Sequence, residues 1–461
     1  MTDASTALAP GAWKVLIVAT LGSVMAQIDA TIVNVSLSSL AGDLRTTLGT
    51  IQWVTSGYLL ALTLILPLNG WLVDRIGARA VYLWCFAAFT VSSALCGLAW
   101  SAPSLIGFRV VQGLAGGLLA PMAQMMVARV AGKDMARVAA YVTVPILLAP
   151  LLGPVIAGAI LQHASWRWLF LVNVPVGAVA ISLAALFLPN DRHERRQRDL
   201  DLVGLALLSP ALVLFLYSAD RLTRLSGLAL FMLSLGLLAA FLWTAARKGK
   251  RALIDLELFH SPLFSLASIV QFLSNGTTFA GQMLIPLYLI DAAGRSPAEM
   301  GWLMAPLGLG MICAFPSAGF LAKHLGTRAL AAGGALLATV ATAAFVFLAA
   351  HEFNLVALTV ALFLRGAGLG GIGIPAVTTA YSAVARPDLP MATTTLNIIQ
   401  RLGGPALTTL CATFLGWQLS LAQPAQSGST AYMWAFALLS ALHAATFLVA
   451  LGFPARAKRT D

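Results

Sequence analysis

The feature that most constrains this chain is a series of long apolar segments separated by short polar breaks. A membrane-spanning α-helix needs about 20 consecutive, mainly apolar residues. Fourteen segments reach that length, at residues 12–37, 48–71, 80–99, 103–129, 137–162, 167–189, 201–219, 225–246, 263–290, 297–322, 327–350, 353–381, 389–418 and 429–455. The sequence therefore predicts an all-α integral membrane protein with 14 transmembrane helices.

The composition argues against a soluble protein of this size. Of the 461 residues, 59% are hydrophobic and only 10% are charged, whereas soluble domains carry about 25% charged residues. The net charge is +11, but the lysines and arginines cluster in the short breaks and not along a basic helix with interleaved aromatic residues. We therefore expect a lipid bilayer around the chain and no nucleic-acid partner.

The distribution of lysine and arginine predicts the orientation in the membrane. Cytoplasmic loops of membrane proteins are enriched in both residues. With the N-terminus inside, 20 of the 28 lysines and arginines fall on the cytoplasmic side, 5 fall on the other side and 3 lie within spans. This bias predicts that both termini are cytoplasmic, and it agrees with an even number of spans.

An internal repeat divides the chain into two related halves. A shift of 249 residues aligns residues 53–80 with residues 302–329. The matched positions include Gly77 with Gly326, Arg79 with Arg328 and, in a looser echo further along, Arg109 with Arg365. Parallel halves with a substrate path between them are a recurrent plan of transporters. The expected parts are an N-terminal six-helix half at 1–190, an inserted helix pair with its linkers at 191–262, and a C-terminal six-helix half at 263–461.

Five short motifs resemble those of one transporter family. The segment "GWLVDRIGAR" at 70–79 resembles the loop signature between the second and third helices of the major facilitator superfamily, and "FRVVQG" at 108–113 resembles its fourth-helix arginine motif. The segment "APLLGPVIAG" at 149–158 is similar to the fifth-helix motif of its proton-driven exporters. The segments "DATIVNVSL" at 29–37 and "SWRWLFLVNVPVG" at 165–177 are similar to motifs of its drug exporters. The chain is thereby identified as a member of the fourteen-span drug:proton antiporters, with the major facilitator fold.

The resemblance implies roles for two groups of residues. The loop between the second and third helices would act as a conformational latch, formed by Gly70, Asp74, Arg75, Gly77 and Arg79. Within it, Asp74 would dock on a helix N-terminus or on an arginine in one conformational state. The fifth-helix motif would support antiport, through Pro150, Gly153, Pro154 and Gly158. The alternative for the fifth-helix group is helix packing alone.

One carboxylate, Asp29, lies well inside a span. An ionised group at the bilayer centre costs at least about 2.5–3.5 kcal/mol, so it requires a partner, a water-filled cavity or a proton. Counting from the outer ends of the spans at about 1.5 Å per residue puts Asp29 roughly 12 Å deep and Arg109 roughly 9 Å deep. A nearby cation favours an ionised carboxylate and burial disfavours it. We hypothesise that Asp29 binds the transported proton and that Arg109 tunes its proton affinity; the alternative is a static ion pair that only fixes helix packing.

Further polar residues within the spans are candidates for a substrate cavity. They are Gln27, Thr31, Asn34, Gln112, Asn275, Gln282, Arg365 and Arg401. Because embedded cations outnumber the one embedded carboxylate, a dicationic substrate is disfavoured. The alternative for Gln27, Thr31 and Asn34 is a hydrogen bond between helices, worth about 0.6 kcal/mol. For Asn275 and Gln282 the alternative is a lipid-facing or core position.

We predict proton-driven efflux of small amphipathic or toxic organic compounds across the cytoplasmic (inner) membrane by alternating access. The proton gradient would supply the energy. The sequence has no Walker loop, nucleophile triad or metal-binding cluster, so we expect no enzyme activity, no catalytic residue, no metal and no cofactor. The partners would be a small-molecule substrate, protons and the bilayer, with the protein acting as a monomer. Two alternatives stay open: a dedicated proton-coupled exporter of a metabolite or lipid, and a non-transporting membrane sensor or scaffold.

Overall fold

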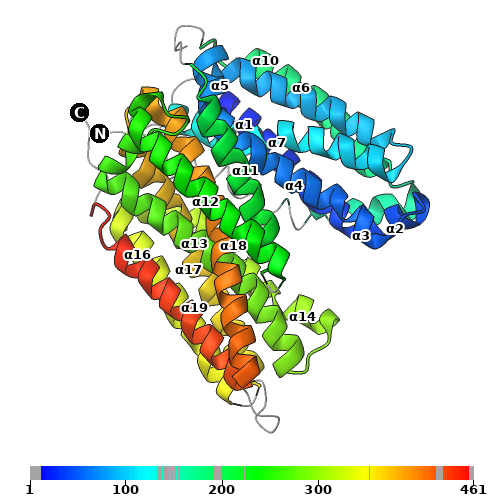
Figure 1. The fold of residues 1–461 in the computed structure, drawn as a ribbon. Coiled ribbons are helices and arrows are strands. Elements are labelled where there is room, and N and C mark those ends of the chain that lie inside the picture. The colour runs from blue at the N-terminus through cyan, green and yellow to red at the C-terminus, as the bar shows by residue number, and fades with distance from the viewer. Residues whose placement is uncertain are drawn as a thin grey trace, which may run out of the picture. The chain divides into compact units, whose positions relative to one another are not determined.

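The protein is helical throughout its described part. The structure is a computed structural model that describes residues 12–131, 156–191, 199–219, 224–351, 353–421 and 429–455, with the isolated positions 138, 145, 149, 152, 153, 221 and 222. Every regular element in these residues is a helix (Figure 1). The predicted all-α class is therefore confirmed.

The number of spans is supported in part. Ten helical segments among the described residues are long and apolar enough to cross a membrane. Two further helices are long but more polar, α13 (Pro262–Leu287, 26 residues) and α18 (Leu389–Leu421, 33 residues). Helix α11 (Leu202–Ser218) is apolar and has 17 residues. The predicted span at 137–162 lies largely outside the described residues, as do both termini, so the count of 14 and the cytoplasmic termini stay predictions.

The chain folds into two compact units. Unit 1 comprises Met1–Tyr217, Ala229–Leu256 and Arg386–Thr395, and unit 2 comprises Ser218–Leu228, Glu257–Ala385 and Leu396–Asp461. The division at residues 190 and 262 follows the internal repeat and stays a prediction.

Unit 1 is a bundle built around one long helix. Helix α7 (Ala102–Ala131) packs against α1 (Ala12–Val35), α4 (Trp53–Ile65) and α6 (Ala78–Gly97), and α10 (Asn173–Phe187) packs against α6 and α1. The other described helices that lie wholly or largely in this unit are α2 (Leu37–Asp43), α3 (Leu48–Ile51), η1 (Leu66–Leu68), α5 (Asn69–Ile76), α9 (Trp168–Leu171), α11, α12 (Leu225–Lys248), η4 (Gly249–Arg251) and η7 (Arg386–Asp388).

Unit 2 is a second bundle of long helices. Helix α17 (Leu355–Ser382) packs against α13, α15 (Ala305–Leu325) and α16 (Thr327–Ala350), and α19 (Ser429–Ala450) packs against α13 and α16. Most of α18 also belongs to this unit, while its first residues, up to Thr395, belong to unit 1.

The predicted repeat is visible at two tight turns. Gly77 separates α5 from α6 with φ 90° and ψ 150°, and Gly326 separates α15 from α16 with φ 88° and ψ 163°. A positive φ of this size is a conformation that glycine adopts without steric penalty. The predicted match of Gly77 with Gly326 is therefore confirmed by the backbone.

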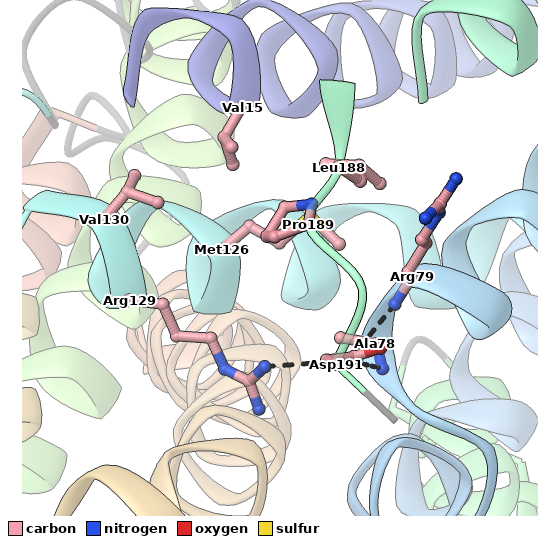
Figure 2. A pocket seen from close by; sticks show the side chains of 9 residues that line it. All are labelled: Val15, Ala78, Arg79, Met126, Arg129, Val130, Leu188, Pro189 and Asp191. Carbon is pink, nitrogen blue, oxygen red and sulfur yellow. Dashed lines mark hydrogen bonds and ion pairs between the residues drawn. The ribbon is translucent and has the colours of Figure 1, made fainter. Parts of the chain in front are cut away.

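The matched arginines that follow these turns also make matching bonds. Arg79 Nη2 donates a hydrogen bond to the carbonyl oxygen of Ala185, in the last turn of α10, at 2.6 Å. Arg328 Nε donates to the carbonyl oxygen of Phe453, just after α19, at 2.6 Å. Figure 2 shows Arg79 at the start of α6, close to the residues that follow α10. Each turn is thus tied to the end of a later helix of its own unit, α10 in unit 1 and α19 in unit 2.

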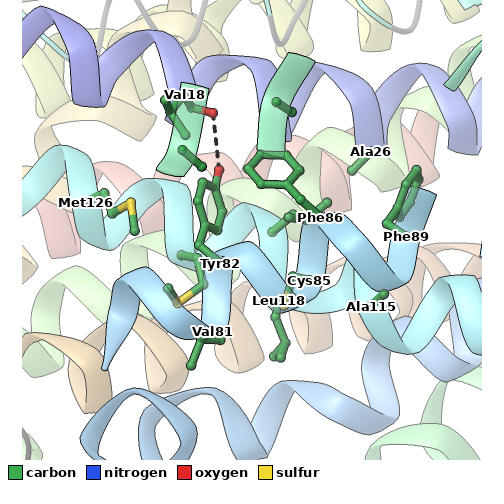
Figure 3. Close-up of a cluster of buried hydrophobic side chains, with 14 of the residues drawn as sticks. Val18, Ala26, Val81, Tyr82, Cys85, Phe86, Phe89, Ala115, Leu118 and Met126 are labelled. Atoms are coloured by element: carbon green, nitrogen blue, oxygen red, sulfur yellow. Dashed lines mark hydrogen bonds between the residues drawn. The ribbon is translucent and has the colours of Figure 1, made fainter. Parts of the chain in front are cut away.

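A compact apolar core joins α1, α6 and α7 in unit 1. The rings of Tyr82, Phe86 and Phe89 are fully buried among aliphatic side chains (Figure 3). The Tyr82 hydroxyl lies 3.5 Å from the carbonyl oxygen of Val18. Gly22 allows this approach, because a Cβ there would collide with the Tyr82 hydroxyl. This core fixes the helices that carry the polar network described next.

Candidate functional site

A polar network lies inside unit 1, on helices α1, α7 and α10. Asp29 and Arg109 are completely buried, and Gln112 and Asn173 expose 4% or less of their surface. Arg109 Nη1 lies 2.6 Å from Asp29 Oδ2, which makes a buried ion pair. The structure therefore brings together the two charged residues that helix counting places at similar depth.

Three donors hold the Asp29 carboxylate. Besides Arg109, Gln112 Nε2 donates to Asp29 Oδ1 at 3.1 Å, and Asn173 Nδ2 donates to the same oxygen at 2.9 Å. An ionised carboxylate is an acceptor only, so this environment matches the unprotonated form. The two oxygens differ, because Oδ2 receives its hydrogen bond from Arg109 while Oδ1 receives two from neutral amides.

The Arg109 guanidinium is held from several sides. Its Nε donates to the carbonyl oxygen of Val54 at 3.2 Å, and its Nη1 donates to Gln112 Oε1 at 2.8 Å as well as to Asp29. Its Cζ lies 4.1 Å from the centre of the Tyr58 ring, a cation–π contact. Within the described residues, Arg109 Nη2 has no hydrogen-bond partner. Helices α1, α4 and α7 therefore meet at this one side chain.

A second layer of bonds orients the two amides. Ser93 Oγ accepts a hydrogen bond from Asn173 Nδ2 at 3.2 Å and donates to the carbonyl oxygen of Phe170 at 2.9 Å. The thiol of Cys96 donates to Gln112 Oε1 at 3.6 Å. Sequence reasoning missed Asn173 and Ser93. The available signal for Asn173 was its position as a polar residue inside the apolar segment that begins "SWRWLFLVN".

The predicted latch residues surround the turn between α5 and α6. Asp191 Oδ2 accepts hydrogen bonds from the backbone N–H groups of Ala78, at 2.5 Å, and Arg79, at 3.4 Å (Figure 2). Arg129 Nη1 lies 3.8 Å from the same oxygen. A carboxylate at a helix N-terminus is favourable, because the helix dipole is positive there. The acid at the N-terminus of α6 is therefore Asp191, which sequence reasoning missed; Asp74 lies half-buried on α5.

The beginning of the latch packs against the start of α18. Gly70 is buried, and a Cβ at this position would lie 3.4 Å from both Met391 Cε and Thr394 Oγ1. The preceding residue, Asn69, donates from Nδ2 to Thr394 Oγ1 at 3.1 Å. These residues all belong to unit 1. The start of α5 therefore makes a polar contact with the start of α18, more than 300 residues later in the sequence. Arg75 is exposed, and the latch role stays a prediction.

Only part of the fifth-helix motif is described. Pro150 and Pro154 lie outside the described residues. Gly153 faces α1, because a Cβ there would collide with Thr31, whereas Gly158 has open space around it. Gly153 thus permits close approach of the first helix, as small residues do between membrane helices.

The cavity candidates of unit 1 fall into different environments. Gln27 is exposed, and Thr31 is half-buried with its hydroxyl bonded to the Gln27 carbonyl oxygen at 3.0 Å. The Asn34 side chain lies outside what the structure describes. Gln112 belongs to the Asp29 network.

The cavity candidates of unit 2 are equally varied. Gln282 is exposed, and Asn275 and Arg401 are half-buried. Arg365 is completely buried on α17. A cavity shared by all these residues stays a prediction.

Comparison with known proteins identifies the family. Residues 19–407 match the family model described as Major Facilitator Superfamily. This chain belongs to the major facilitator superfamily. It is a multi-pass membrane protein of a family of transporters, and not an enzyme.

A curated relative and two solved structures agree with this assignment. The chain is 34% identical over 415 residues to a multidrug resistance protein B homolog of Mycobacterium tuberculosis, covering 87% of this chain and 76% of that protein. It is similar in fold to the human organic anion transporter MFSD10 (TETRAN), with a TM-score of 0.65, 18% identity and coverage of 95% and 99% of the two chains. It is also similar to the proton:xylose symporter XylE, with a TM-score of 0.63, 12% identity and coverage of 94% and 95%.

The Asp29 network combines a buried ion pair with neutral polar groups. Its members are one carboxylate, one guanidinium, two amides, one hydroxyl and one thiol.

Proposed function

We propose that the protein is a drug:proton antiporter that exports small amphipathic or toxic organic compounds across the cytoplasmic (inner) membrane. In this proposal it spans the membrane 14 times with both termini in the cytoplasm, and it acts as a monomer by alternating access. The multidrug resistance relative supports the substrate class. The observation that carries the proton coupling is the buried ion pair between Asp29 and Arg109.

The two oxygens of Asp29 suggest where the proton binds. Oδ1 keeps its two amide donors, Gln112 and Asn173, whether the carboxyl is charged or neutral. Oδ2 is bonded to Arg109. A proton that forms an O–H bond at Oδ2 therefore displaces Arg109 and leaves the amide bonds in place. A proton leaving Oδ2 restores the ion pair.

This exchange couples protonation to helix packing. Asp29 is on α1, Arg109 is on α7, and the guanidinium also bonds to Val54 on α4. When the carboxyl is neutral, the attraction between α1 and α7 is lost, and the buried cation favours movement toward water or another acceptor. Proton uptake and release would thus alternate two arrangements of the same three helices, which is what an antiporter requires.

The remaining predicted residues complete the proposal. Gly70, Asp74, Arg75, Gly77 and Arg79 would hold one conformation as a latch, and Pro150, Gly153, Pro154 and Gly158 would prevent a proton leak at the fifth helix. The substrate would contact Gln27, Thr31, Asn34, Gln112, Asn275, Gln282, Arg365 and Arg401. No cofactor takes part, because the proton gradient supplies the energy.

The test uses inverted membrane vesicles with an acid interior, monitored by a pH-sensitive dye. A panel of lipophilic cations, neutral drugs and organic anions is added to vesicles with the native protein, Asp29→Asn, Asp29→Glu or Asp291→Asn. The last is a matched control, because Asp291 is a helical carboxylate that bonds to Tyr432 in unit 2. We expect at least one compound to discharge the gradient through the native protein, the control and, more weakly, Asp29→Glu, but not through Asp29→Asn.

Two results would contradict the proposal in different ways. Native coupling in Asp29→Asn would remove Asp29 from the proton path. If no compound of the panel discharges the gradient through the native protein, the multidrug assignment fails and a dedicated exporter takes its place.

A further inference from the structure

Unit 2 buries an arginine that its own helices do not neutralise. Arg365 on α17 is completely buried. Its Nη2 donates to the carbonyl oxygen of Thr277 on α13 at 2.8 Å. Its Nε and Nη1 have no hydrogen-bond partner within the described residues. Buried donors normally have partners, so these two nitrogens require an explanation.

The surrounding helices cannot supply a counter-charge. Helices α13, α15, α16, α17, α18 and α19 contain no Asp or Glu anywhere along their length. Removing an ion from water costs several kcal/mol even after the protein relaxes. These six helices therefore offer the buried guanidinium no counter-charge.

The position of Arg365 is built into the packing. Gly281 on α13 lies directly against the guanidinium, and a Cβ there would collide with it. The guanidinium therefore lies across the α13 backbone between Thr277 and Gly281. The guanidinium fits in the interior because residue 281 is glycine. A side chain at residue 281 would occupy the space that the guanidinium fills.

Unit 2 contains a second buried side chain with unused hydrogen-bonding capacity. His443 on α19 is completely buried, and neither ring nitrogen has a hydrogen-bond partner within the described residues. A neutral imidazole carries one N–H donor. Buried groups without partners thus occur on two of the long helices of unit 2, none of which contains an acid.

We propose that Arg365 forms the centre of a binding site for one compact monovalent anion in the interior of unit 2. Such an anion supplies the missing charge and an acceptor for the unused donors. The chemistry fits a halide such as chloride or a small carboxylate. Binding involves no covalent step and is independent of Asp29.

The first experiment measures anion-dependent stability of the purified protein in detergent. The thermal unfolding midpoint is recorded in sodium gluconate at constant ionic strength while chloride or acetate replaces part of the gluconate. We expect a saturable rise for the native protein, because a ligand that binds the folded state stabilises it by mass action. In Arg365→Met the apparent affinity for the anion should fall by about tenfold or more. Arg167→Met, which changes an exposed arginine of unit 1, is the matched control and should keep the native response.

A second measurement covers the case in which Arg365→Met does not fold. Radioactive chloride binding to the native protein is competed with unlabelled bromide and with acetate. Competition by both anions identifies a general monoanion site, and competition by bromide alone identifies a halide site. No saturable chloride or acetate effect on the native protein, or a native response in a folded Arg365→Met, overturns the proposal. Neither measurement uses a substrate or a proton gradient, so the result is separate from that for the proposed antiport.

Discussion

The two units each bury one arginine at matching positions of the repeat, yet they treat its charge differently. In unit 1, Arg109 pairs with Asp29 at 2.6 Å and also bonds to Gln112 and the Val54 backbone. In unit 2, the one bond of Arg365 within the described residues goes to a backbone carbonyl, in an interior whose long helices contain no acid. Arg109 is neutralised by a carboxylate of its own unit, whereas in our proposal Arg365 is neutralised by a bound anion.

This difference separates two uses of a buried charge. A paired charge becomes costly only when its partner changes state, so Asp29 and Arg109 form a switch that a proton operates. A buried charge without a counter-ion carries an uncompensated desolvation cost, so Arg365 favours the binding of an anion. The comparison predicts that matched substitutions in the two units have different consequences.

The largest expected effect is the loss of one member of the unit 1 pair. Replacing one partner of a buried ion pair leaves the other uncompensated and destabilises a protein by about 3–5 kcal/mol. We expect Asp29→Leu and Arg109→Met each to lower the thermal unfolding midpoint in detergent strongly. The double variant should recover much of the loss, because it removes both charges. A double variant as unstable as the sum of the singles would show that packing, and not charge, dominates this site.

The same arginine substitution in unit 2 should behave differently. In gluconate without chloride, Arg365→Met removes an unneutralised buried charge, and we expect a midpoint equal to or above that of the native protein. Arg109→Met, measured in the same buffer, should lie well below it. The comparison fails if both variants are destabilised equally, since the two arginines would then have equivalent internal partners.

A medium effect should follow from removing one amide donor of Asp29. Hydrogen bonds to charged groups contribute about 1.5–3 kcal/mol. Asn173→Ala should therefore destabilise less than Arg109→Met, while proton-coupled export persists with a shifted pH profile. A variant that exports with the native pH profile would mean that Asn173 only supports packing.

The helices could be predicted because the bilayer fixes their length. Each apolar segment had to reach about 20 residues, and the match of Gly77 with Gly326 in the repeat was enough to locate both turns. The contacts of unit 1 that could not be predicted join residues far apart in the sequence. Asp191 reaches the start of α6 from the end of α10, more than 110 residues away in sequence, and a single sequence carries no signal for that return.

The depth of the site residues along their helices could be predicted, but the direction in which each side chain faces could not. The rise per residue is constant, so the similar depths of Asp29 and Arg109 followed from counting. The rotation of each helix depends on packing, so nothing in the sequence indicated that Asn173 and Ser93 face Asp29.

A smaller effect should come from the acid at the start of α6. A charge at a helix terminus contributes about 0.3–1 kcal/mol when exposed and up to about 2 kcal/mol when partly buried. Asp191→Asn should therefore lower the unfolding midpoint slightly. In unit 2 the corresponding backbone N–H, that of Arg328, bonds to the Pro454 carbonyl oxygen at 3.3 Å, so no single substitution there has a matching effect. An unchanged midpoint in Asp191→Asn would assign the contact to geometry without net stabilisation.

The smallest expected effect concerns a third acid, Asp201, which immediately precedes α11 and lies next to a partly exposed partner. Burial alone would raise the pKa of its carboxyl, but hydrogen bonds from Lys248, at 2.5 Å, and from the backbone N–H groups of Gly204 and Leu253 outweigh it and lower the pKa below its ordinary value. A carboxyl with a lowered pKa in the folded state stabilises the protein above its unfolded-state pKa, and this contribution is lost as the pH falls through the folded-state pKa.

The unfolding midpoint of the native protein should therefore decrease on acidification from about pH 5 to about pH 2, with a contribution from Asp201. In Asp201→Asn the midpoint should be lower near neutral pH, and the decrease should be smaller. An equal decrease in both proteins would assign the acid sensitivity to other carboxylates. Because Lys248 remains one-third exposed, water screens this pair, which is why its removal should be felt far less than that of Asp29 or Arg109.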